Sequence, residues 1–234
     1  MNKEKLEPIK DLVSVIMSTY NDEKTIFDSI QSILDQSYKN IELLVLDDAS
    51  TDNTRKILNI FKDKRIKIFT NKKNIGLTKS LNFLIKKSSG LFIARQDADD
   101  VSLPSRFEKQ LDFLNKHNIK VCTTRALIKN SSKKIPGFSF YIPKKIIIRH
   151  KNPFIHGTLL IEKDLINRMG NYDEKFYYAQ DYELFSKLIK NKYNVKTLKE
   201  PLYVLNTTNN ISTYKKQEQQ YYADCVKNNL VPNI

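Results

Sequence analysis

Four consecutive residues in the middle of the chain combine three carboxylates at a spacing that suits a metal ion. Asp97 and Asp99 are separated by Ala98, and Asp100 follows directly. On an extended turn the side chains of Asp97 and Asp99 can converge on one divalent cation, and Mg²⁺ and Mn²⁺ prefer such oxygen ligands. The cation would neutralise a departing diphosphate. The alternative is a solvated acidic turn that caps the helix expected from Pro104.

Two further acidic positions are candidates for the same site. Asp47 and Asp48 follow an apolar run and could accept hydrogen bonds from a nucleobase or ribose, or cap a helix that begins near Ser50. Asp181 is expected at the start of another helix. It could act as a general base toward an acceptor hydroxyl, or it could serve as an N-cap, and the neighbouring residues alone favour the N-cap.

The histidines, cysteines and glycines exclude several other chemistries. No three His or Cys residues have the spacing of a zinc site, and neither a Gly-rich phosphate loop nor a Gly-x-Ser-x-Gly motif occurs. His156 lies in an apolar stretch, where a lone histidine is more often a core or rim residue than a catalyst. Cys122 and Cys225 are expected to be ordinary buried thiols of a reducing compartment.

The elements that must position the acidic residues alternate in type along the first half. Apolar runs at 13–17, 41–46, 66–69 and 91–94 predict strands, and periodic apolar residues predict helices after each of them. This alternation predicts βαβ units and a mostly parallel sheet. In such sheets ligands bind at the carboxyl ends of the strands. Since two of the four strands run into paired aspartates, both pairs should lie at that edge.

The second half is less regular. We expect strands at 121–129, 154–161, 195–198 and 203–205, helices at 163–169, 182–189 and 214–228, and a polar, turn-rich segment at 130–145. No linker tract or repeat divides the chain, so we predict one domain over 1–234. Its parts would be a first half at about 12–115, a second half at about 116–212 and a C-terminal helix or tail at 213–234.

The net charge of +14 is the strongest compositional signal. It fits either a compositional bias spread over solvated faces or peripheral contact with an anionic membrane. No nucleic-acid-binding motif accompanies the charge, so we expect no nucleic-acid partner. No apolar run approaches the length of a membrane span. The expected location is the cytoplasm, with contact at the inner face of the membrane as the alternative.

Several segments, in order and at characteristic spacing, resemble the inverting family-2 glycosyltransferases of the GT-A fold. They are residues 13–21 (VSVIMSTYN), 46–54 (LDDASTDNT), 74–82 (NIGLTKSLN) and 93–107 (IARQDADDVSLPSRF), with looser matches at 156–158, 170–173 and 179–184. The resemblance covers roughly 13–189 and implies that the first half, at about 12–115, binds the nucleotide sugar and that the second half, at about 116–212, binds the acceptor. It implies a Rossmann-like, mostly parallel central sheet flanked by helices, with a smaller irregular C-terminal part on the acceptor side.

The resemblance also implies a role for each matching residue. Asp99 would be the principal ligand of Mn²⁺ or Mg²⁺, with Asp97 beside the metal and ribose, and Asp181 would be the base. The nucleoside-diphosphate sugar, most simply a UDP sugar, would be bound by Ser18, Thr19, Tyr20, Asp22, Asp48, Lys79, Asp97, Ala98 and Asp99. The acceptor, a glycan or lipid-linked hydroxyl in surface polysaccharide synthesis, or the diphosphate would contact His156, Arg149 and Arg106.

Two departures from the family pattern matter. Gln180 stands before Asp181 where the family often has Glu, which should leave the pKa of Asp181 less raised. The segment 204–208 (VLNTT) lacks the Arg and His that often hold the diphosphate, so Arg149, Lys79 or the Lys-rich tail would have to substitute. This second departure keeps open an alternative, a transferase-like binding subunit with weak or no activity.

Overall fold

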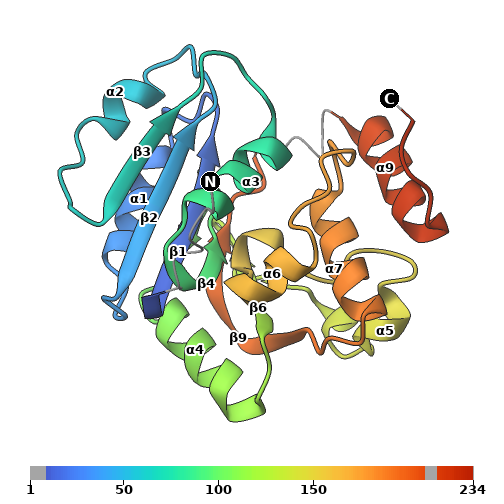
Figure 1. Ribbon diagram of the computed structural model, residues 1–234. Coiled ribbons are helices and arrows are strands. Elements are labelled where there is room, and N and C mark those ends of the chain that lie inside the picture. Colours follow the sequence, from blue (N-terminus) through green and yellow to red (C-terminus); the bar gives the residue numbers. More distant parts are fainter. Residues whose placement is uncertain (1–8, 209–214, 234) are drawn as a thin grey trace, which may run out of the picture.

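The first four strands of the central sheet are all parallel, as the alternating pattern predicts. In the computed structural model, which describes residues 9–208 and 215–233, β1 (Ile9–Thr19) pairs with β2 (Ile41–Asp47) and β4 (Gly90–Arg95), and β2 pairs with β3 (Ile66–Thr70). The strand order here is β3-β2-β1-β4 (Figure 1). The carboxyl ends of β1, β2 and β4 therefore meet at one edge, which carries both acidic pairs.

The remaining strands extend this sheet in mixed orientation. β8 (Leu160–Glu162) is antiparallel to both β4 and β6 (Val121–Ile128), and β9 (Lys196–Leu205) is parallel to β6. Two short strands, β5 (Val101–Ser102) and β7 (Lys134–Ile135), add antiparallel pairs to β9 and β6. The sheet joins both halves of the chain, and the predicted α/β fold with a smaller irregular second part is confirmed. The predicted parallel pairing holds for β3-β2-β1-β4, and the strands beyond β4 pair in both orientations.

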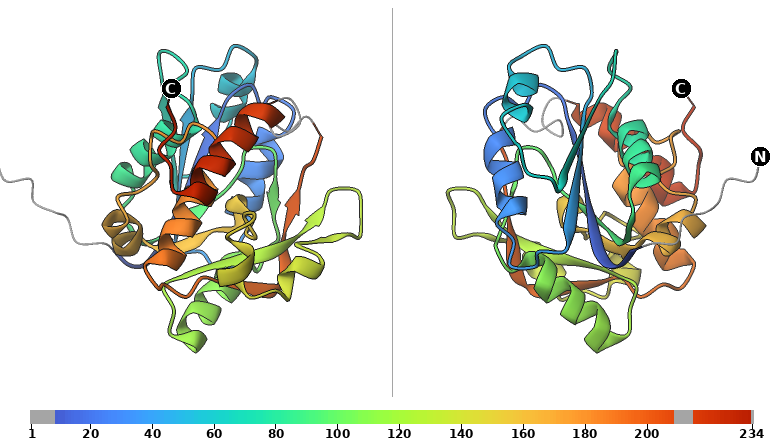
Figure 2. Two further views of the ribbon diagram at one scale, coloured as in Figure 1. Left: turned by 90° about the vertical axis from the view of Figure 1, so that its right-hand side faces the viewer. Right: turned by 60° about the vertical axis from the view of Figure 1, so that its left-hand side comes forward.

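Helices cover both faces of the sheet, because alternate residues of the central strands point to opposite sides. One face packs Val13, Val15 and Met17 against α1 (Ile26–Leu34), α2 (Thr54–Leu58) and α4 (Arg106–His117). The other face packs against α3 (Leu77–Lys87), α6 (Lys163–Arg168), α7 (Gln180–Lys190) and α9 (Lys216–Asn228). Figure 2 shows α9 lying along α7 on this second face.

The structure corrects the sequence prediction at two places in the second half. The strand expected over 154–161 is wrong except at its end, because the 3-10 helix η2 (His156–Thr158) precedes β8. The Thr158 hydroxyl donates to the Ile155 carbonyl at 2.8 Å and closes this turn. The two strands expected at 195–198 and 203–205 form the single strand β9, with an irregular register around Pro201. Residues 209–214, which fall in the predicted acceptor half and terminal helix, lie outside the described residues.

Two further expectations concern membrane spans and thiols. Across residues 9–208 and 215–233, every helix is too short or too polar to cross a bilayer. Cys122 and Cys225 are both buried and unpaired with one another, as expected.

Candidate functional site

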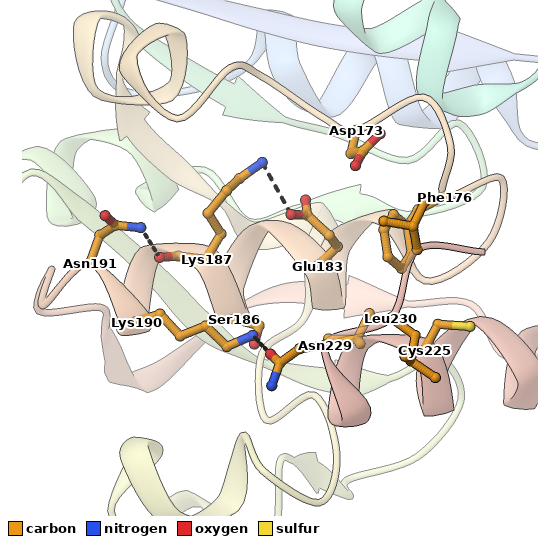
Figure 3. A pocket seen from close by; sticks show the side chains of 12 residues that line it. Asp173, Phe176, Glu183, Ser186, Lys187, Lys190, Asn191, Cys225, Asn229 and Leu230 are labelled. Atoms are coloured by element: carbon orange, nitrogen blue, oxygen red, sulfur yellow. Dashed lines mark hydrogen bonds and ion pairs between the residues drawn. The ribbon is translucent and has the colours of Figure 1, made fainter.

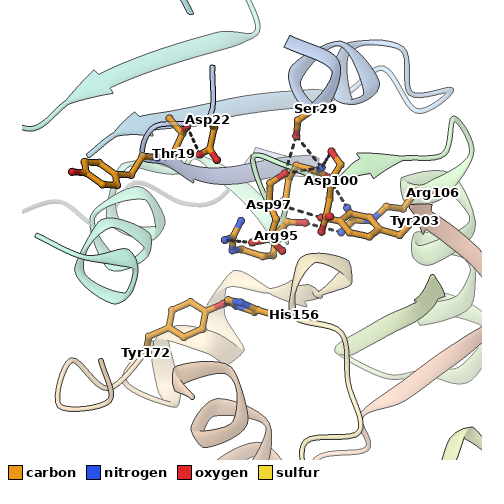
Figure 4. Close-up of polar contacts among 12 residues, drawn as sticks. Thr19, Asp22, Ser29, Arg95, Asp97, Asp100, Arg106, His156, Tyr172 and Tyr203 are labelled. Carbon is orange, nitrogen blue, oxygen red and sulfur yellow. Dashed lines mark hydrogen bonds and ion pairs between the residues drawn. The ribbon is translucent and has the colours of Figure 1, made fainter. Parts of the chain in front are cut away.

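The acidic loop after β4 is held in place by contacts from three other segments. The Arg95 Nη2 donates to Asp97 Oδ1 at 2.6 Å, and the Asp97 backbone N–H donates to the Tyr203 hydroxyl at 3.1 Å. The Ser29 hydroxyl donates to the Asp97 carbonyl at 2.8 Å (Figure 4). Asp97 is therefore fixed from both sides, while its carboxylate stays partly exposed.

Asp99 and Asp100 follow in very different electrostatic states. Burial, together with the negative charges of Asp97 and Asp22, raises the pKa of Asp99 to about 6. Burial and the neighbouring carboxylates raise the pKa of Asp100 to about 9, although its Oδ1 accepts the Asn206 backbone N–H at 2.7 Å. Asp100 is thus a neutral structural group near pH 7. Asp99 forms no ion pair within the described residues, although the charge of Arg95 partly offsets the repulsion, and this environment fits a metal ligand.

The loop after β1 presents the residues expected at the nucleoside. The Asp22 carboxylate accepts the Thr19 hydroxyl at 2.7 Å and the Tyr20 backbone N–H at 3.0 Å, and burial is the main cause of its raised pKa. The Asp22 backbone N–H donates to the Thr54 hydroxyl at 2.9 Å, which ties this loop to the one after β2. Ser18 is half-buried and Tyr20 is exposed, so both are accessible to a ligand.

Asp47 and Asp48 organise the loops that follow them. Asp47 Oδ1 accepts the Ser50 backbone N–H at 2.9 Å, and its Oδ2 accepts the Arg55 Nε–H at 3.2 Å. The helix expected near Ser50 begins instead at Thr54, with Asn53 at the N-cap position, so the expectation that an aspartate of this pair caps it is wrong. The Asp48 carboxylate accepts the Asn71 side-chain amide at 2.7 Å and the Gly76 backbone N–H at 2.9 Å. Asp48 therefore positions the entrance of α3, where Lys79 is exposed in the first turn.

Asp181 lies at the start of α7, as expected, but the N-cap alternative is wrong, because Ala179 occupies the N-cap position and Asp181 is the second residue of the helix. Its Oδ2 accepts the Asn152 side-chain amide at 2.7 Å, while burial is the largest cause of its raised pKa and the charge of Asp97 adds to it. The helix N-terminus favours a carboxylate at this position. A raised pKa improves a carboxylate as a proton acceptor. The effect of Asp97 means that the two carboxylates, from different halves of the chain, are within electrostatic reach.

His156 and Tyr172 form a neutral pair across from the acidic loop. The His156 Nε2 and the Tyr172 hydroxyl are 2.8 Å apart. Burial, and then the positive charge of Arg95, lowers the pKa of His156 to about 3, so the ring is uncharged near neutral pH. In Figure 4 this pair lies on the side of the loop toward which Arg95 extends.

Arg95 is a component of the site that the sequence did not single out. Its side chain is almost fully buried, and only Nη2 has a hydrogen-bond partner, since Nε and Nη1 have none among the described residues. A buried cation requires compensation. The Asp97 carboxylate supplies it at 2.6 Å. The sequence does carry a signal for Arg95 in its position, because it stands at the end of β4 and two residues before Asp97.

The two arginines predicted on the acceptor or diphosphate side, Arg106 and Arg149, lie in different environments. Arg106 lies in the core, where its guanidinium donates to the Ser102 hydroxyl at 2.8 Å and the Arg95 carbonyl at 2.8 Å. This geometry gives Arg106 a structural role under the acidic loop rather than a contact with acceptor or diphosphate. Arg149, just after α5 (Lys144–Ile147), is exposed.

Gly157 allows the second half to approach the acidic loop. A Cβ at this position would lie 2.5 Å from Asp97 Oδ2 and 2.3 Å from the Tyr203 hydroxyl. Ala98 is buried in the same loop. Only a residue without a side chain permits this approach, and the sequence contained no signal that would separate Gly157 from other glycines.

The oxygen ligands available for a metal are few. Across residues 9–208 and 215–233, no three His, Cys, Asp or Glu side chains are grouped as a ready metal site. Mg²⁺ and Mn²⁺ are commonly held by one or two carboxylates completed by water and substrate phosphates. Asp97 and Asp99, with the unbalanced negative charge that raises the pKa of Asp99, fit that kind of site.

A cavity of about 260 Å³ lies elsewhere, between α7 and α9 (Figure 3). It is lined by Glu183 and Lys187, which form an ion pair at 3.1 Å, and by Cys225 and Leu230. None of the residues predicted to act on a nucleotide sugar lines this cavity.

Comparison with known proteins agrees with this geometry. Residues 14–182 match the family described as Glycosyl transferase family 2. The Escherichia coli enzyme UDP-Glc:alpha-D-GlcNAc-diphosphoundecaprenol beta-1,3-glucosyltransferase WfgD is 39% identical over 183 residues, which are 76% of this chain and 70% of that protein.

Two solved structures share the fold at low sequence identity. S. aureus TarS 1-349 in complex with UDP superposes with a TM-score of 0.74 at 23% identity, over 92% of this chain and 64% of that one. The mannosyltransferase PcManGT from Pyrobaculum calidifontis, in complex with GDP-Man and Mn2+, superposes with a TM-score of 0.70 at 17% identity, over 90% of this chain and 62% of that one. The chain thus spans a little under two thirds of either solved structure.

Proposed function

The chain belongs to glycosyl transferase family 2, and from this premise we propose that it transfers a sugar from a UDP sugar to a hydroxyl group with inversion at the anomeric carbon. Glycosyltransferase activity in polysaccharide or lipid-linked glycan synthesis follows from the family. The proposal adds the donor, the stereochemistry and the roles of individual residues.

The observation that carries the proposal is the meeting of two carboxylate groups from different halves of the molecule. Asp97 and Asp99 follow β4, and Asp181 begins α7 within electrostatic reach of Asp97. A diphosphate needs positive charge, and an attacking hydroxyl needs a proton acceptor. The arrangement supports both requirements at one place.

A divalent cation, Mn²⁺ or Mg²⁺, would bind at Asp99 and Asp97, and when bound it would stabilise the negative charge of the departing diphosphate. Arg95 holds Asp97 in one orientation. Ser18, Thr19, Tyr20, Asp22 and Asp48 would surround the nucleoside. Lys79, exposed on α3, is the cation that we assign to the phosphate side.

Asp181 would act as the general base. Its carboxylate takes the proton of the acceptor hydroxyl while the hydroxyl oxygen forms a bond to the anomeric carbon. The bond from that carbon to the diphosphate oxygen breaks on the opposite face, which inverts the configuration. The Asn152 amide orients the carboxylate for this step, and the neutral His156–Tyr172 pair would offer hydrogen bonds to the sugar or acceptor.

The choice of donor and acceptor rests on relatives. The E. coli relative is named for a UDP-glucose donor and a diphosphoundecaprenol-linked acceptor, and TarS has been solved with UDP. We extend both to this chain, so the acceptor would be a glycan or lipid-linked hydroxyl. The cytoplasmic location stays a prediction.

A donor screen tests this function directly. Purified protein is incubated with UDP, GDP and dTDP sugars, with and without Mn²⁺, and release of nucleoside diphosphate is measured. We expect release from one donor class, dependent on metal and lost in Asp99→Asn. No metal-dependent release from any donor, together with no calorimetric binding of UDP, would contradict the proposal.

A second candidate, a weakly active transferase-like subunit, is favoured by one observation. The end of β9 and the residues after it, Val204–Thr208, lack the Arg and His expected there, and the described backbone at Asn206 is used to hold Asp100. Rapid metal-dependent turnover of a donor by the isolated chain would exclude this candidate.

A further inference from the structure

Residues 129–151 form one of two strongly basic stretches of the chain. Residues 129–151 contain seven Lys or Arg and no Asp or Glu, so a tenth of the chain supplies half of the net charge of +14. No acidic residue occurs between Asp112 and Glu162. The other basic stretch, residues 55–87, contains eleven Lys or Arg and one Asp. The charge is thus gathered in two stretches rather than spread evenly along the chain, and 129–151 is the one without any acidic residue.

The basic residues of this segment, which we call the basic segment (129–151), are not neutralised within the described residues. Every ion pair among the described residues involves a Lys or Arg outside 129–151, so no basic residue of the basic segment forms one. Lys133, Lys134, Lys145, Arg149 and Lys151 are exposed. Their charge is therefore available to an anionic partner.

The same segment exposes large apolar side chains. Phe138 is 83% exposed, Tyr141 67% and Ile146 56%, although Ile147 and Ile148 next to it are buried in the core. These three residues come from η1 (Phe138–Phe140), its immediate end and α5 (Lys144–Ile147). Aromatic and aliphatic side chains set among lysines are the composition of segments that lie in the interface of an anionic bilayer.

The segment is an ordered platform, because Phe140 is clamped between cations. The Arg125 guanidinium lies 5.1 Å and the Lys144 Nζ 5.2 Å from the centre of its ring. The Lys144 Nζ also donates to the Phe140 carbonyl at 2.9 Å, which joins η1 to α5. Phe138 and Tyr141 on either side are thus held outward by a fixed backbone.

The platform is connected directly to the proposed base. The Tyr182 hydroxyl donates to the Ile148 carbonyl at 2.6 Å, and Asn152, one residue beyond the basic segment, donates to Asp181 at 2.7 Å. Figure 1 shows α5 beside α7, the helix that carries both Asp181 and Tyr182. A surface bound to α5 would therefore lie close to the acceptor side of the site.

We propose that η1, α5 and the lysines of the basic segment form a docking surface for an anionic lipid bilayer. Phe138, Tyr141 and Ile146 enter the interface, and the basic side chains contact lipid phosphates. Resting on the proposed function, this docking presents the Asp181 side of the site to an acceptor whose lipid lies in the same bilayer. The charge signature and the exposed aromatic residues together specify a bilayer rather than a soluble polyanion.

Vesicle sedimentation tests the docking surface without any need for the donor or acceptor. The intact chain is mixed with vesicles of phosphatidylcholine alone or with phosphatidylglycerol. We expect binding only to the anionic vesicles, with loss at high salt. Lys133→Gln, Lys134→Gln and Lys145→Gln combined should weaken binding roughly a hundredfold, since each basic residue at such a surface contributes about fivefold. The control combines Lys39→Gln, Lys62→Gln and Lys64→Gln, three exposed lysines of the first half, and should change little.

The apolar part is tested separately with Ile146→Ser and its matched control Ile60→Ser, which is 61% exposed in the first half. Ile146→Ser should weaken vesicle binding about threefold to tenfold, whereas Ile60→Ser should not. Equal effects of the lysine variant and its control would overturn the proposal. So would an effect of the lysine variant without any effect of Ile146→Ser, because that pattern describes a soluble polyanion site.

The two proposals fail in distinguishable ways. Vesicle binding without calorimetric UDP binding would reject the transferase assignment and keep the docking surface. Metal-dependent UDP-sugar turnover without binding to anionic vesicles would reject the docking surface alone. Circular dichroism of each variant verifies that the fold is intact.

Discussion

The two halves of this molecule obtain their order in different ways. Residues 12–115 are built from repeated strand–helix units, and their loops are joined over short spans, as where the Asp22 backbone meets Thr54. The second half depends on contacts between more distant segments, such as Gln110 with the Thr158 carbonyl and the Asp97 backbone N–H with the Tyr203 hydroxyl. The half that we propose to bind the nucleotide is thus encoded locally, and the half that we propose to bind the acceptor is encoded by tertiary packing.

The largest effect that would sharpen this comparison is expected from Asp99→Asn in the first half. We expect loss of nucleoside-diphosphate release by about a thousandfold, because the cation that stabilises the leaving group loses its principal ligand. The variant should keep its melting temperature, since removing one of several neighbouring carboxylates relieves repulsion. Asp112→Asn, an exposed aspartate on α4, is the control. Equal rates in both variants would remove Asp99 from the site.

A somewhat smaller effect is expected from Asp181→Asn in the second half. Transfer to an acceptor should fall about a hundredfold to a thousandfold, the usual contribution of a general base. Calorimetric binding of the UDP sugar should stay within about twofold of the unaltered protein, because donor binding belongs to the other half. Asp164→Asn, an exposed aspartate in α6, serves as the control. Loss of donor binding in Asp181→Asn would contradict the proposal that the first half alone binds the donor.

Gly157→Ala tests the contact between the halves. The added Cβ would meet Asp97 Oδ2 at 2.5 Å and the Tyr203 hydroxyl at 2.3 Å, so we expect a loss of about 1–3 kcal/mol in the free energy of unfolding. Urea denaturation measures it. Gly137→Ala is the matched control, because a Cβ there meets nothing within 4 Å. If both variants unfold at the same urea concentration, the approach of η2 to the acidic loop is looser than described.

The smallest effect concerns pH. Because the pKa of Asp99 is raised to about 6, a proton and the cation compete for this carboxylate, and activity should fall as the pH drops through about 6. The sign follows from the raised value, since the charged form needed for the metal prevails above it. A tenfold rise in Mn²⁺ should move the acidic limb down by up to about one pH unit. If the acidic limb of the pH–activity profile does not respond to Mn²⁺, the titrating group is not Asp99.

The sequence predicted the first half well because its signals are local. Periodic apolar residues defined four strands and their helices, and the aspartates were placed at strand ends by direct succession in the chain. Asp97 does come within electrostatic reach of both Asp99 and Asp181. Their catalytic and metal-binding roles stay predictions.

Sequence reasoning failed where a residue acts through a distant partner. Tyr203 supports Asp97 from 106 positions away, and Asn152 holds Asp181 from a turn without a regular pattern. Arg106, chosen for its charge, proved to be a buried cross-link, since nothing in its helix reveals that Gln96 and Ser102 face it. Periodicity describes neighbours along an element and carries no information on such pairings.

The bond between Asp100 and Asn206 has a consequence for how this enzyme can vary. Asp100 accepts the backbone N–H of Asn206, so the link between the acidic loop and the end of β9 does not depend on which side chain stands at 206. Evolution, or an engineer, can therefore exchange the side chains of 204–208 without releasing the loop that carries Asp99. The end of β9 is a place where substrate preference can drift while the fold of the acidic loop stays fixed.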